Sequence, residues 1–340
     1  MKKSLGLALG AFFAAATLAG VALAQQALPD GAAIDKALKE AHAKFADVTE
    51  GKNADYIPAL AKVPSKLFGI ALVTTDGKVY SVGDADSLFS IQSISKVFTM
   101  ARVIQDQGEQ KIEDSVGVDA TGQVFNSIVA VEQYKGHQMN AMVNPGAIAT
   151  TGMVGGKTDA EKWGKIVETD SDFAGRKLEV NDEVYKSEAA TNQRNQAIGQ
   201  LMSAYGLISD DPHMVTDVYT RQCSLNVSAK DLAQMAATLA NGGTNPVTKK
   251  KVIDAKHVPG ILAVMATAGL YDDSGIWLYH VGLPAKSGVG GGILAVSPGR
   301  FGIAAFSPPL DAAGNSVRAQ RAIRYVTDAL NSNLFASSPR

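Results

Sequence analysis

The sequence predicts an α+β fold, in which one antiparallel sheet is flanked by helices and further helices form a second lobe. Short apolar runs with strand character lie near both ends of the 340-residue chain. The stretch between them, about 110–265, has the periodicity of helices joined by long loops. Strands from both ends can share one sheet, so the central helices are left to form their own lobe. We expect a binding cleft between the two lobes.

The N-terminal elements predict a helix followed by a β-hairpin. Residues 34–47 have helical periodicity, and residues 67–73 ("LFGIALV") form a short apolar run. Asp76-Gly77 is a typical two-residue hairpin turn, and residues 78–81 supply the second strand.

The later elements alternate in the same way. Three helices are predicted in the middle of the chain: residues 188–205, closed by Gly206, residues 228–239, which open with a capping-box pattern, and residues 258–268, with Pro259 in the first turn. The C-terminal part predicts strands at 277–283, 292–296 and 301–306, and an amphipathic helix at 317–334.

The first 24 residues read as a secretory signal peptide. Lys2-Lys3 precedes an apolar run, and Ala22-Leu23-Ala24 fits the small-x-small cleavage rule. The alternative is a transmembrane anchor, but the run is short for a span. We therefore expect a catalytic domain at 25–340 that is periplasmic or secreted, with no stable membrane association after cleavage.

Composition excludes several classes of protein. The net charge is −1 and no basic tract is present, so no nucleic-acid partner is expected. Cys223 is the single cysteine, which rules out an internal disulfide. It could be a nucleophile, but no histidine lies nearby in sequence, and a buried thiol is the better interpretation. No His or Cys pair has metal-ligand spacing, so no metal site is expected.

The stretch "FSIQSISKVF" (89–98) holds a candidate nucleophile. If a helix begins near Ser93, then Ser93 and Lys96 lie on one face, one turn apart. A lysine that loses its proton on burial can activate a serine, and a helix N-terminus favours developing negative charge. The alternative is a capping serine followed by a surface lysine. Ser90 and Ser95 have no base at the same spacing.

A second stretch, "PAKSGVGGGILAV" (284–296), supports the nucleophile. Lys286-Ser287-Gly288 resembles the Lys-[Ser/Thr]-Gly element of serine β-lactamases and penicillin-binding proteins. The resemblance implies their fold, with the N–H groups of Val289 and Ser93 forming an oxyanion hole. The glycines could instead form a flexible turn or a phosphate loop, although no phosphate-loop motif is met. The third element of penicillin-type enzymes is missing, since "SDD" at 209–211 ends in Asp.

Four other segments identify a narrower group: "MVNPGAIAT", "SEAATNQRNQAI", "VYTRQCSLNVS" and "AGLYDDSGIW". With the two stretches above, they resemble the bacterial serine-dependent glutaminases across nearly the whole mature chain. The resemblance implies hydrolysis of L-glutamine to L-glutamate and ammonia through a serine acyl-enzyme, no cofactor, and a homo-oligomer, either a tetramer or a dimer. It also implies catalytic roles for Ser93, Lys96, Tyr219 and Lys286, and a substrate site of Gln92, Ser93, Asn144, Glu188, Asn195, Tyr219, Tyr271 and Val289.

The chemistry of these residues suits glutamine. Glu188 can pair with the substrate amine, while Asn144 and Asn195 can donate to its carboxylate. Glu188 and Asn195 are seven residues apart, which places both on one side of a continuous helix. Tyr219 could pass a proton to the leaving ammonia, and Tyr271 could close the site. The working base stays open among Lys96, Lys286 and Tyr219.

Other interpretations remain at this point. Glu188 and Asn195 could be a solvated helix face, the two tyrosines could be core residues, and Asn144 could be a turn asparagine. Pro145 stands where the glutaminase family usually has Ala, and it restrains Asn144. A β-lactamase or penicillin-binding-type peptidase, and a non-catalytic glutamine-binding protein, are the alternative functions.

Overall fold

Strands from both ends of the chain form one sheet, as the sequence predicted. The structure is a computed structural model that describes residues 27–133 and 139–336, so the predicted signal peptide lies outside the described residues. The sheet is antiparallel throughout, in the order β2-β1-β7-β6-β5. Its strands are β1 (Gly69–Thr74), β2 (Val79–Gly83), β5 (Ala285–Gly288), β6 (Gly292–Ser297) and β7 (Phe301–Phe306).

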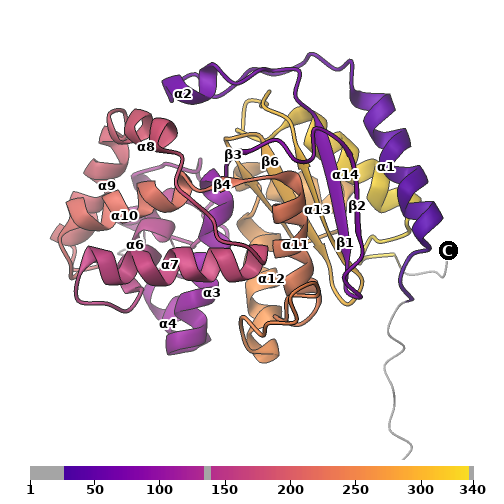
Figure 1. The fold of residues 1–340 in the computed structure, drawn as a ribbon. Helices are drawn as coiled ribbons and strands as arrows, with labels where there is room; N and C mark the ends of the chain where they lie inside the picture. The colour runs from indigo at the N-terminus through magenta and orange to yellow at the C-terminus, as the bar shows by residue number, and fades with distance from the viewer. Residues whose placement is uncertain (1–26, 134–138, 337–340) are drawn as a thin grey trace, which may run out of the picture.

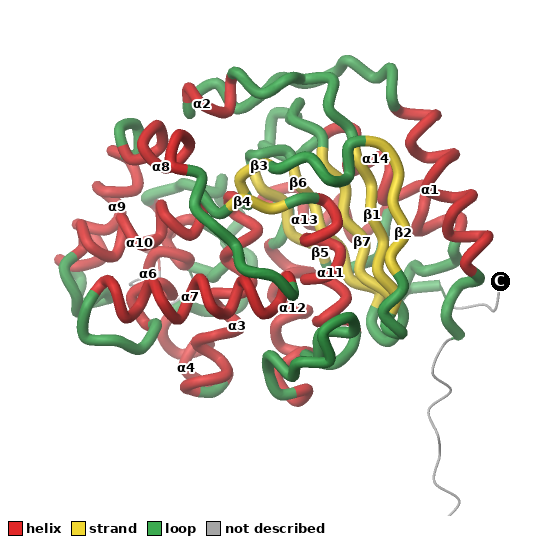
Figure 2. Tube along the Cα trace, viewed as in Figure 1, coloured by secondary structure: helices red, strands yellow, loops and turns green. Residues whose placement is uncertain are grey.

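The inner strands are buried along their whole length because both faces of the sheet are covered (Figures 1 and 2). On β1, Ile70 and Leu72 pack in the core that α1 (Gly31–Phe45) and α14 (Val317–Ala329) share. Ala71 and Val73 point the other way, into the core that includes α11 (Ala229–Ala240). Burial on two sides explains why residues 67–73 read as a continuous run rather than an alternating pattern.

The central helices gather beside the sheet as a second lobe, at the left of Figure 1. Around them lie the short helix α2 (Pro58–Ala61), a two-residue ladder of β3 (Phe89–Ser90) with β4 (Asn226–Val227), and α12 (Val258–Ala268). The lobe consists of α3 (Ser95–Gln107), α4 (Glu109–Ser115), α5 (Val129–Glu132), α6 (Asn144–Met153), α7 (Asp159–Ala174), α8 (Asp182–Ala189), α9 (Gln193–Ala204) and α10 (Pro212–Cys223). None of the helices within residues 27–133 and 139–336 combines the length and apolar composition that crossing a bilayer requires.

Several local predictions are confirmed. The capping box that opens α11 is complete, because the Ser228 side chain accepts from the Asp231 N–H and Asp231 accepts from the Ser228 N–H. Pro259 lies in the first turn of α12, where a missing N–H costs little.

The strand predicted at 277–283 is wrong, because these residues belong to helix α13 (Ser274–His280) and the turn after it. The Ser274 hydroxyl accepts from the Leu270 N–H and donates to the Tyr271 carbonyl, which starts the helix. Trp277 and Val281 are both buried at a helical spacing of four. Aromatic residues favour strands in general, but here the spacing of the buried side chains matches a helix.

Two helix boundaries also differ from the prediction. The helix predicted at 188–205 is two helices, α8 and α9, separated at Ala190-Thr191-Asn192. The Asn192 side chain bonds Thr220 and Gln196 instead of capping α9, as expected of a residue that competes with helical backbone. At the C-terminus, α14 stops at Ala329 because Arg300 donates to the carbonyls of Leu330 and Asn331.

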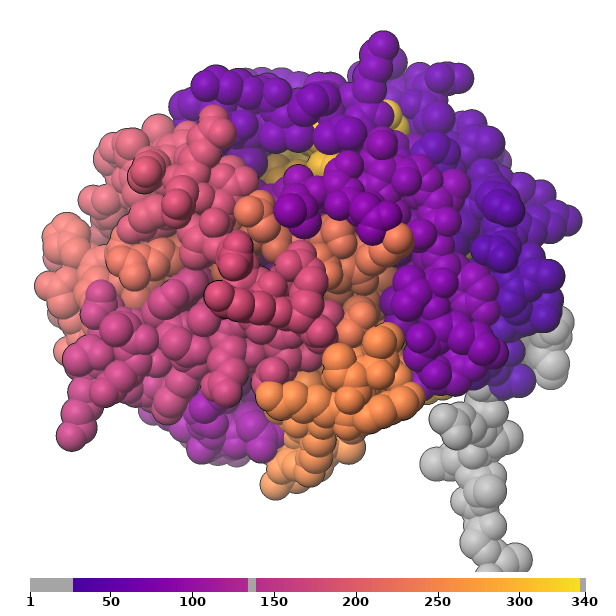
Figure 3. All heavy atoms as spheres, in the orientation of Figure 1, coloured from indigo at the N-terminus to yellow at the C-terminus, as the bar shows by residue number. Residues whose placement is uncertain are grey.

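The segment between α1 and β1 passes over the junction of the two lobes. It carries α2, drawn in indigo at the top of Figure 1. In the space-filling view this segment arches over a hollow in which yellow atoms of the C-terminal part are visible (Figure 3). The chain therefore adds a roof to the region where the sheet meets the helical lobe.

Candidate active site

Ser93 lies in a strained turn at the entrance to α3. It is the middle residue of a 3₁₀ turn, Gln92–Ile94, which leads directly into that helix. Gln92 has a φ of 50°, an uncommon conformation for a residue other than glycine. The Ser95 hydroxyl donates to the Gln92 carbonyl at 2.8 Å, which holds the turn. Ser93 is 6% exposed and lines a pocket.

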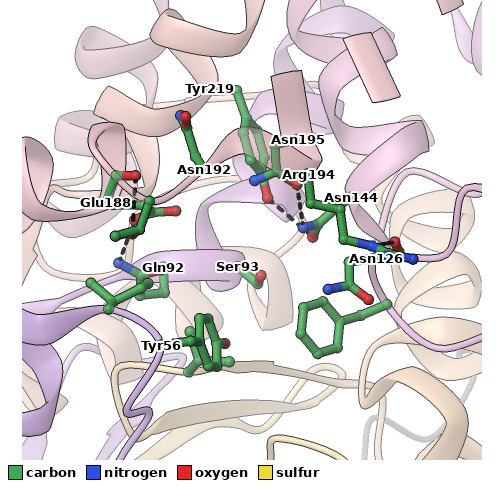
Figure 4. A pocket seen from close by; sticks show the side chains of 14 residues that line it. Tyr56, Gln92, Ser93, Asn126, Asn144, Glu188, Asn192, Arg194, Asn195 and Tyr219 are labelled. Atoms are coloured by element: carbon green, nitrogen blue, oxygen red, sulfur yellow. Dashed lines mark hydrogen bonds between the residues drawn. The ribbon is translucent and has the colours of Figure 1, made fainter. Parts of the chain in front are cut away.

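The pocket is a cavity of about 130 Å³ between the sheet and the helical lobe. Figure 4 shows Ser93 at its centre, with polar side chains converging from several elements. The lining residues are Tyr56, Ile57, Gln92, Ser93, Phe125, Asn126, Asn144, Glu188, Thr191, Asn192, Arg194, Asn195, Tyr219 and Val289. Seven of the eight predicted substrate residues therefore line one pocket, and Tyr271 is the exception. The seven are Gln92, Ser93, Asn144, Glu188, Asn195, Tyr219 and Val289.

Asn144 connects Lys96 to the pocket wall. The Lys96 ammonium donates to Asn144 Oδ1 at 2.7 Å, and the Tyr219 hydroxyl donates to the same oxygen at 3.2 Å. Asn144 Nδ2 in turn donates to Asn195 Oδ1 at 2.9 Å. Asn144 is thus a junction between the candidate bases and helix α9, and it also lines the pocket, where its predicted role toward a substrate carboxylate stays a prediction.

Burial changes the acid–base properties of Lys96. The side chain is almost completely buried, and the loss of hydration lowers the pKa of Lys96 to about 7, against the opposing attraction of Cys223 and Glu188. Its proton can therefore be released near neutral pH.

Glu188 is a buried carboxylate at the opposite side of the pocket from Asn126. It lies in the last turn of α8 and accepts from Gln92 Nε2 at 3.1 Å. Burial raises the pKa of Glu188 to about 7, while the bond from Gln92 and the charge of Lys96 lower it. Because α8 ends before Asn195, the argument from one continuous helix is wrong, yet the break between the helices still brings both residues to the pocket.

Lys286 and Tyr271 form a layer behind the pocket. Lys286, on β5, donates to the carbonyls of Gly269 and Ser287, each at 2.8 Å, and lies 4.1 Å from the Tyr271 ring centre. Burial, and then the charge of Lys96, hold the pKa of Lys286 well below its usual range. The Tyr271 hydroxyl interacts with Ser93 and Ser287, and burial raises the pKa of Tyr271. Neither residue belongs to the pocket wall.

The end of β5 lies directly against the turn that carries Ser93. A Cβ atom on Gly288 would stand 2.6 Å from the Ile91 carbonyl oxygen, so only glycine permits this approach. Val289 follows and lines the pocket. Within the part of the chain that the structure describes, no backbone carbonyl accepts from the Val289 N–H. That N–H is available for an oxyanion, as the predicted oxyanion hole requires.

Cys223 is buried, as predicted, and burial raises the pKa of its thiol to about 12. A thiol with such a pKa is not a nucleophile at neutral pH. Among the described residues, no cluster of three or more His, Cys, Asp or Glu side chains could hold a metal ion.

Sequence reasoning missed seven lining residues. Thr191, Asn192 and Arg194 belong to the quoted segment 187–198, so their neighbours in the motif were a usable signal. Phe125 and Asn126 lie in a loop, and Tyr56 and Ile57 lie in the roof segment. No local pattern marks these four, because only the tertiary fold brings them to Ser93.

Comparison with known proteins decides between the families that this geometry allows. The model of one protein family, described as Glutaminase, matches residues 51–335. The chain belongs to the glutaminase family. This confirms the resemblance recognised from the six sequence segments.

This glutaminase-family chain is similar to named relatives and to solved structures over most of its length. A glutaminase of Colwellia psychrerythraea is 52% identical, covering 90% of this chain and 99% of the relative. Glutaminase 2 of Yersinia pestis is 49% identical, covering 92% of each chain. The solved structure of the probable glutaminase ybaS has a TM-score of 0.89 at 47% identity, covering 91% of this chain and 100% of that one. A Bacillus glutaminase structure has a TM-score of 0.79 at 27% identity, covering 89% and 98%. The β-lactamase-like α+β fold is thereby confirmed.

Pro145 is accommodated in this member of the family without loss of the pocket. It lies in the first turn of α6, where proline fits a helix, and Asn144 opens the helix with its side chain bonded on both sides. The Asn144 N–H donates to the Phe125 carbonyl at 2.7 Å. The restraint that Pro145 imposes therefore coincides with the conformation that the site uses.

Proposed function

We propose that this protein hydrolyses L-glutamine to L-glutamate and ammonia through an acyl-enzyme on Ser93, with Lys96 as the working base. The observation that carries the proposal is the convergence of Lys96 and Tyr219 on one Asn144 oxygen, beside a serine held in a strained turn. Family membership gives the substrate class, since the curated relatives are named glutaminases.

The reaction proceeds in two halves. The Ser93 oxygen attacks the carbon of the side-chain amide and its proton passes to Lys96, while the N–H groups of Ser93 and Val289 stabilise the oxyanion. Collapse of the intermediate breaks the C–N bond, and a proton from Lys96, relayed by Tyr219, leaves with ammonia. Water then attacks the glutamyl ester by the same route, giving L-glutamate and free Ser93.

Lys96 is favoured over Lys286 as the base for structural reasons. Lys96 lies in the first turn of α3, three residues after Ser93, and bonds a residue of the pocket wall. Lys286 is held by two backbone carbonyls behind Tyr271. We assign Lys286 to positioning Tyr271, and Tyr271 to holding the Ser93 hydroxyl.

The direct test is ammonia release from L-glutamine by protein that begins at residue 25. Ser93→Ala should abolish release, and Ser87→Ala, a serine outside the pocket, should leave it unchanged. Acid-quenched wild type should carry a glutamyl adduct on Ser93 by mass spectrometry. Release that survives in Ser93→Ala would exclude the serine mechanism. Acylation by a chromogenic cephalosporin, or its turnover, in place of glutamine hydrolysis would favour the alternative of a β-lactamase or penicillin-binding-type peptidase.

We also propose that the chain is exported and cleaved after Ala24. The basic Lys2-Lys3, the apolar run and the small-x-small pattern support this. N-terminal sequencing of protein recovered outside the cytoplasm should begin at Gln25. Retention of the whole chain in the membrane fraction would instead support the anchor.

A homo-oligomer, either a tetramer or a dimer, is part of the same proposal and rests on the resemblance alone. Sedimentation equilibrium of the mature protein measures it directly. A monomer at micromolar concentration would contradict this expectation.

A further inference from the structure

Arg194 is a charged residue of the pocket to which the mechanism above gives no role. It lies in the first turn of α9, next to Asn195, and it is exposed. Among the fourteen described residues that line the pocket, Glu188 and Arg194 are the two with charged side chains. In Figure 4, Arg194 and Asn126 lie on one side of Ser93, while Glu188 and Gln92 lie on the other.

The guanidinium of Arg194 is fixed in place before any ligand arrives. Its Nε donates to the Asn126 carbonyl at 2.7 Å. That loop is itself anchored, because the Phe125 carbonyl accepts from the Asn144 N–H and the Val124 carbonyl accepts from the Ser127 N–H. One of the five N–H groups of the guanidinium is used in this contact, and the fork at its end keeps donors for a planar anion. A cation oriented in this way loses little entropy on binding a carboxylate.

We propose that Arg194 determines substrate specificity by recognising the α-carboxylate of the substrate, as Glu188 recognises its α-ammonium group. This inference rests on the proposed function and extends it to the choice of substrate. The two charges of the pocket are opposite in sign, as are the two charges on the α-carbon of a free amino acid. Asn195 helps, because its Oδ1 is occupied by Asn144 and its NH₂ group is left to donate.

A consequence follows for the chemical class of substrate. A glutamine side chain within a peptide has neither the free ammonium nor the free carboxylate, so it leaves Glu188 and Arg194 without partners. Unpaired polar groups in a binding site penalise the wrong ligand more than a missing apolar contact does. The pocket should therefore select free L-glutamine over peptide amides.

The test compares two substrates and three variants by ammonia release. L-Glutamine carries both charges, and 4-aminobutanamide keeps the amine and the amide but lacks the carboxylate. Arg194→Gln should raise KM for L-glutamine about 10- to 50-fold with kcat within about threefold, and should leave kcat/KM for 4-aminobutanamide unchanged. Arg194→Lys should recover part of the loss. Lys186→Gln, which removes an exposed cation from the neighbouring helix α8, is the matched control and should change neither substrate.

Binding separates a failure of this inference from a failure of the proposed catalysis. Calorimetric titration of L-glutamine into Ser93→Ala and into Ser93→Ala combined with Arg194→Gln needs no turnover. A Kd weakened about 10- to 50-fold by the second change supports the inference even if the wild type releases no ammonia. Three results would each overturn the inference. They are an equal loss of kcat/KM for L-glutamine and 4-aminobutanamide in Arg194→Gln, a Kd for L-glutamine that the second change leaves unaltered, and no binding of L-glutamine to Ser93→Ala.

Discussion

The wall of the pocket and the layer directly behind it contain cations of different kinds. At the wall, Arg194 is exposed and bonds one backbone carbonyl. Behind it, Lys96 and Lys286 are almost completely buried, and burial is the largest cause of the lowered pKa of each. The acidic residue of the wall does not follow this division, since Glu188 is buried and has a raised pKa.

The comparison indicates that the extent of burial decides what a cation can do in this site. A cation that stays hydrated keeps its charge and can recognise an anion, whereas a buried lysine loses its proton and can accept one from serine. The two layers should therefore respond differently to mutation: the inner layer through kcat and the wall through KM.

The largest effect should come from removing the buried base. We expect Lys96→Met to lower kcat for L-glutamine about 10³- to 10⁴-fold, because a general base contributes up to that factor, while KM changes little. Lys96→Arg should lose as much, since a guanidinium does not deprotonate in proteins. Activity in the arginine variant, measured in protein whose circular dichroism matches wild type, would contradict the role of Lys96 as a base.

The next effect should come from the wall. Glu188→Gln removes the charge to which we assign recognition of the substrate ammonium, and we expect KM to rise about 10- to 100-fold with kcat within a few-fold. Glu183→Gln, on the exposed first turn of the same helix, is the matched control. A fall in kcat at constant KM would place Glu188 in the inner layer instead.

The pH dependence joins the two layers. Lys96 must be neutral and Glu188 ionised, and both have a pKa of about 7, so both requirements are met above pH 7 and lost below it. We expect kcat/KM to fall more than about tenfold per pH unit below 7 in the wild type, and only about tenfold in Glu188→Gln, where one group remains. Because the two groups interact, the apparent values belong to the pair. Equal slopes in the wild type and in Glu188→Gln would show that the ionisation of Glu188 does not contribute to the pH dependence of kcat/KM.

The smallest effect concerns a buried carboxyl group outside the site. Asp170 on α7 is completely buried, and neither of its carboxylate oxygens has a hydrogen-bond partner among the described residues. Burial raises the pKa of Asp170, so the stability it contributes is complete below the unfolded pKa, near 4, and is lost as pH rises.

We therefore expect Asp170→Asn to stabilise the fold by about 1–3 kcal/mol at pH 8, with a smaller gain at pH 5 and unchanged kcat. Calorimetric Tm values at the two pH values test this. Asp172→Asn, which loses its ion pair with Lys250 near the surface, should show no such gain. An Asp170→Asn protein less stable than wild type at pH 8 would mean that the carboxyl has a stabilising partner.

The sequence predicted the architecture well where the hydrophobic periodicity and the turn or cap residues indicate the same boundaries. β7 begins and ends at Phe301 and Phe306, as the apolar run indicated, and α12 has the predicted bounds. The prediction from sequence failed at 277–283, where an aromatic-rich stretch indicated a strand but forms a helix. It also failed at 190–192, where the side chains of Thr191 and Asn192 interrupt a helical pattern. Both failures are cases in which specific hydrogen bonds overrode propensity.

The site was predicted in part for a related reason. Residues in distinctive short segments, such as Ser93 and Glu188, were found, and the structure places them at one pocket. Tyr56 and Asn126 were missed because the roof and loop that carry them have no local signature. The junction role of Asn144 could not be seen either, because hydrogen-bond partners 48 and 51 residues away are set by the tertiary fold.

The pairing of β1 with β7 has a consequence for how the enzyme is made. Gly69 lies opposite Phe306, so a strand from the start of the domain cannot complete its ladder until nearly all of the chain has left the ribosome. Val289 reaches Ser93 only when β5 has joined the same sheet. Contacts of such sequence separation form slowly, and an unfinished chain exposes an unpaired apolar edge. We therefore expect a chain truncated before β7 to be inactive and prone to aggregation, because β1 would keep an unpaired apolar edge.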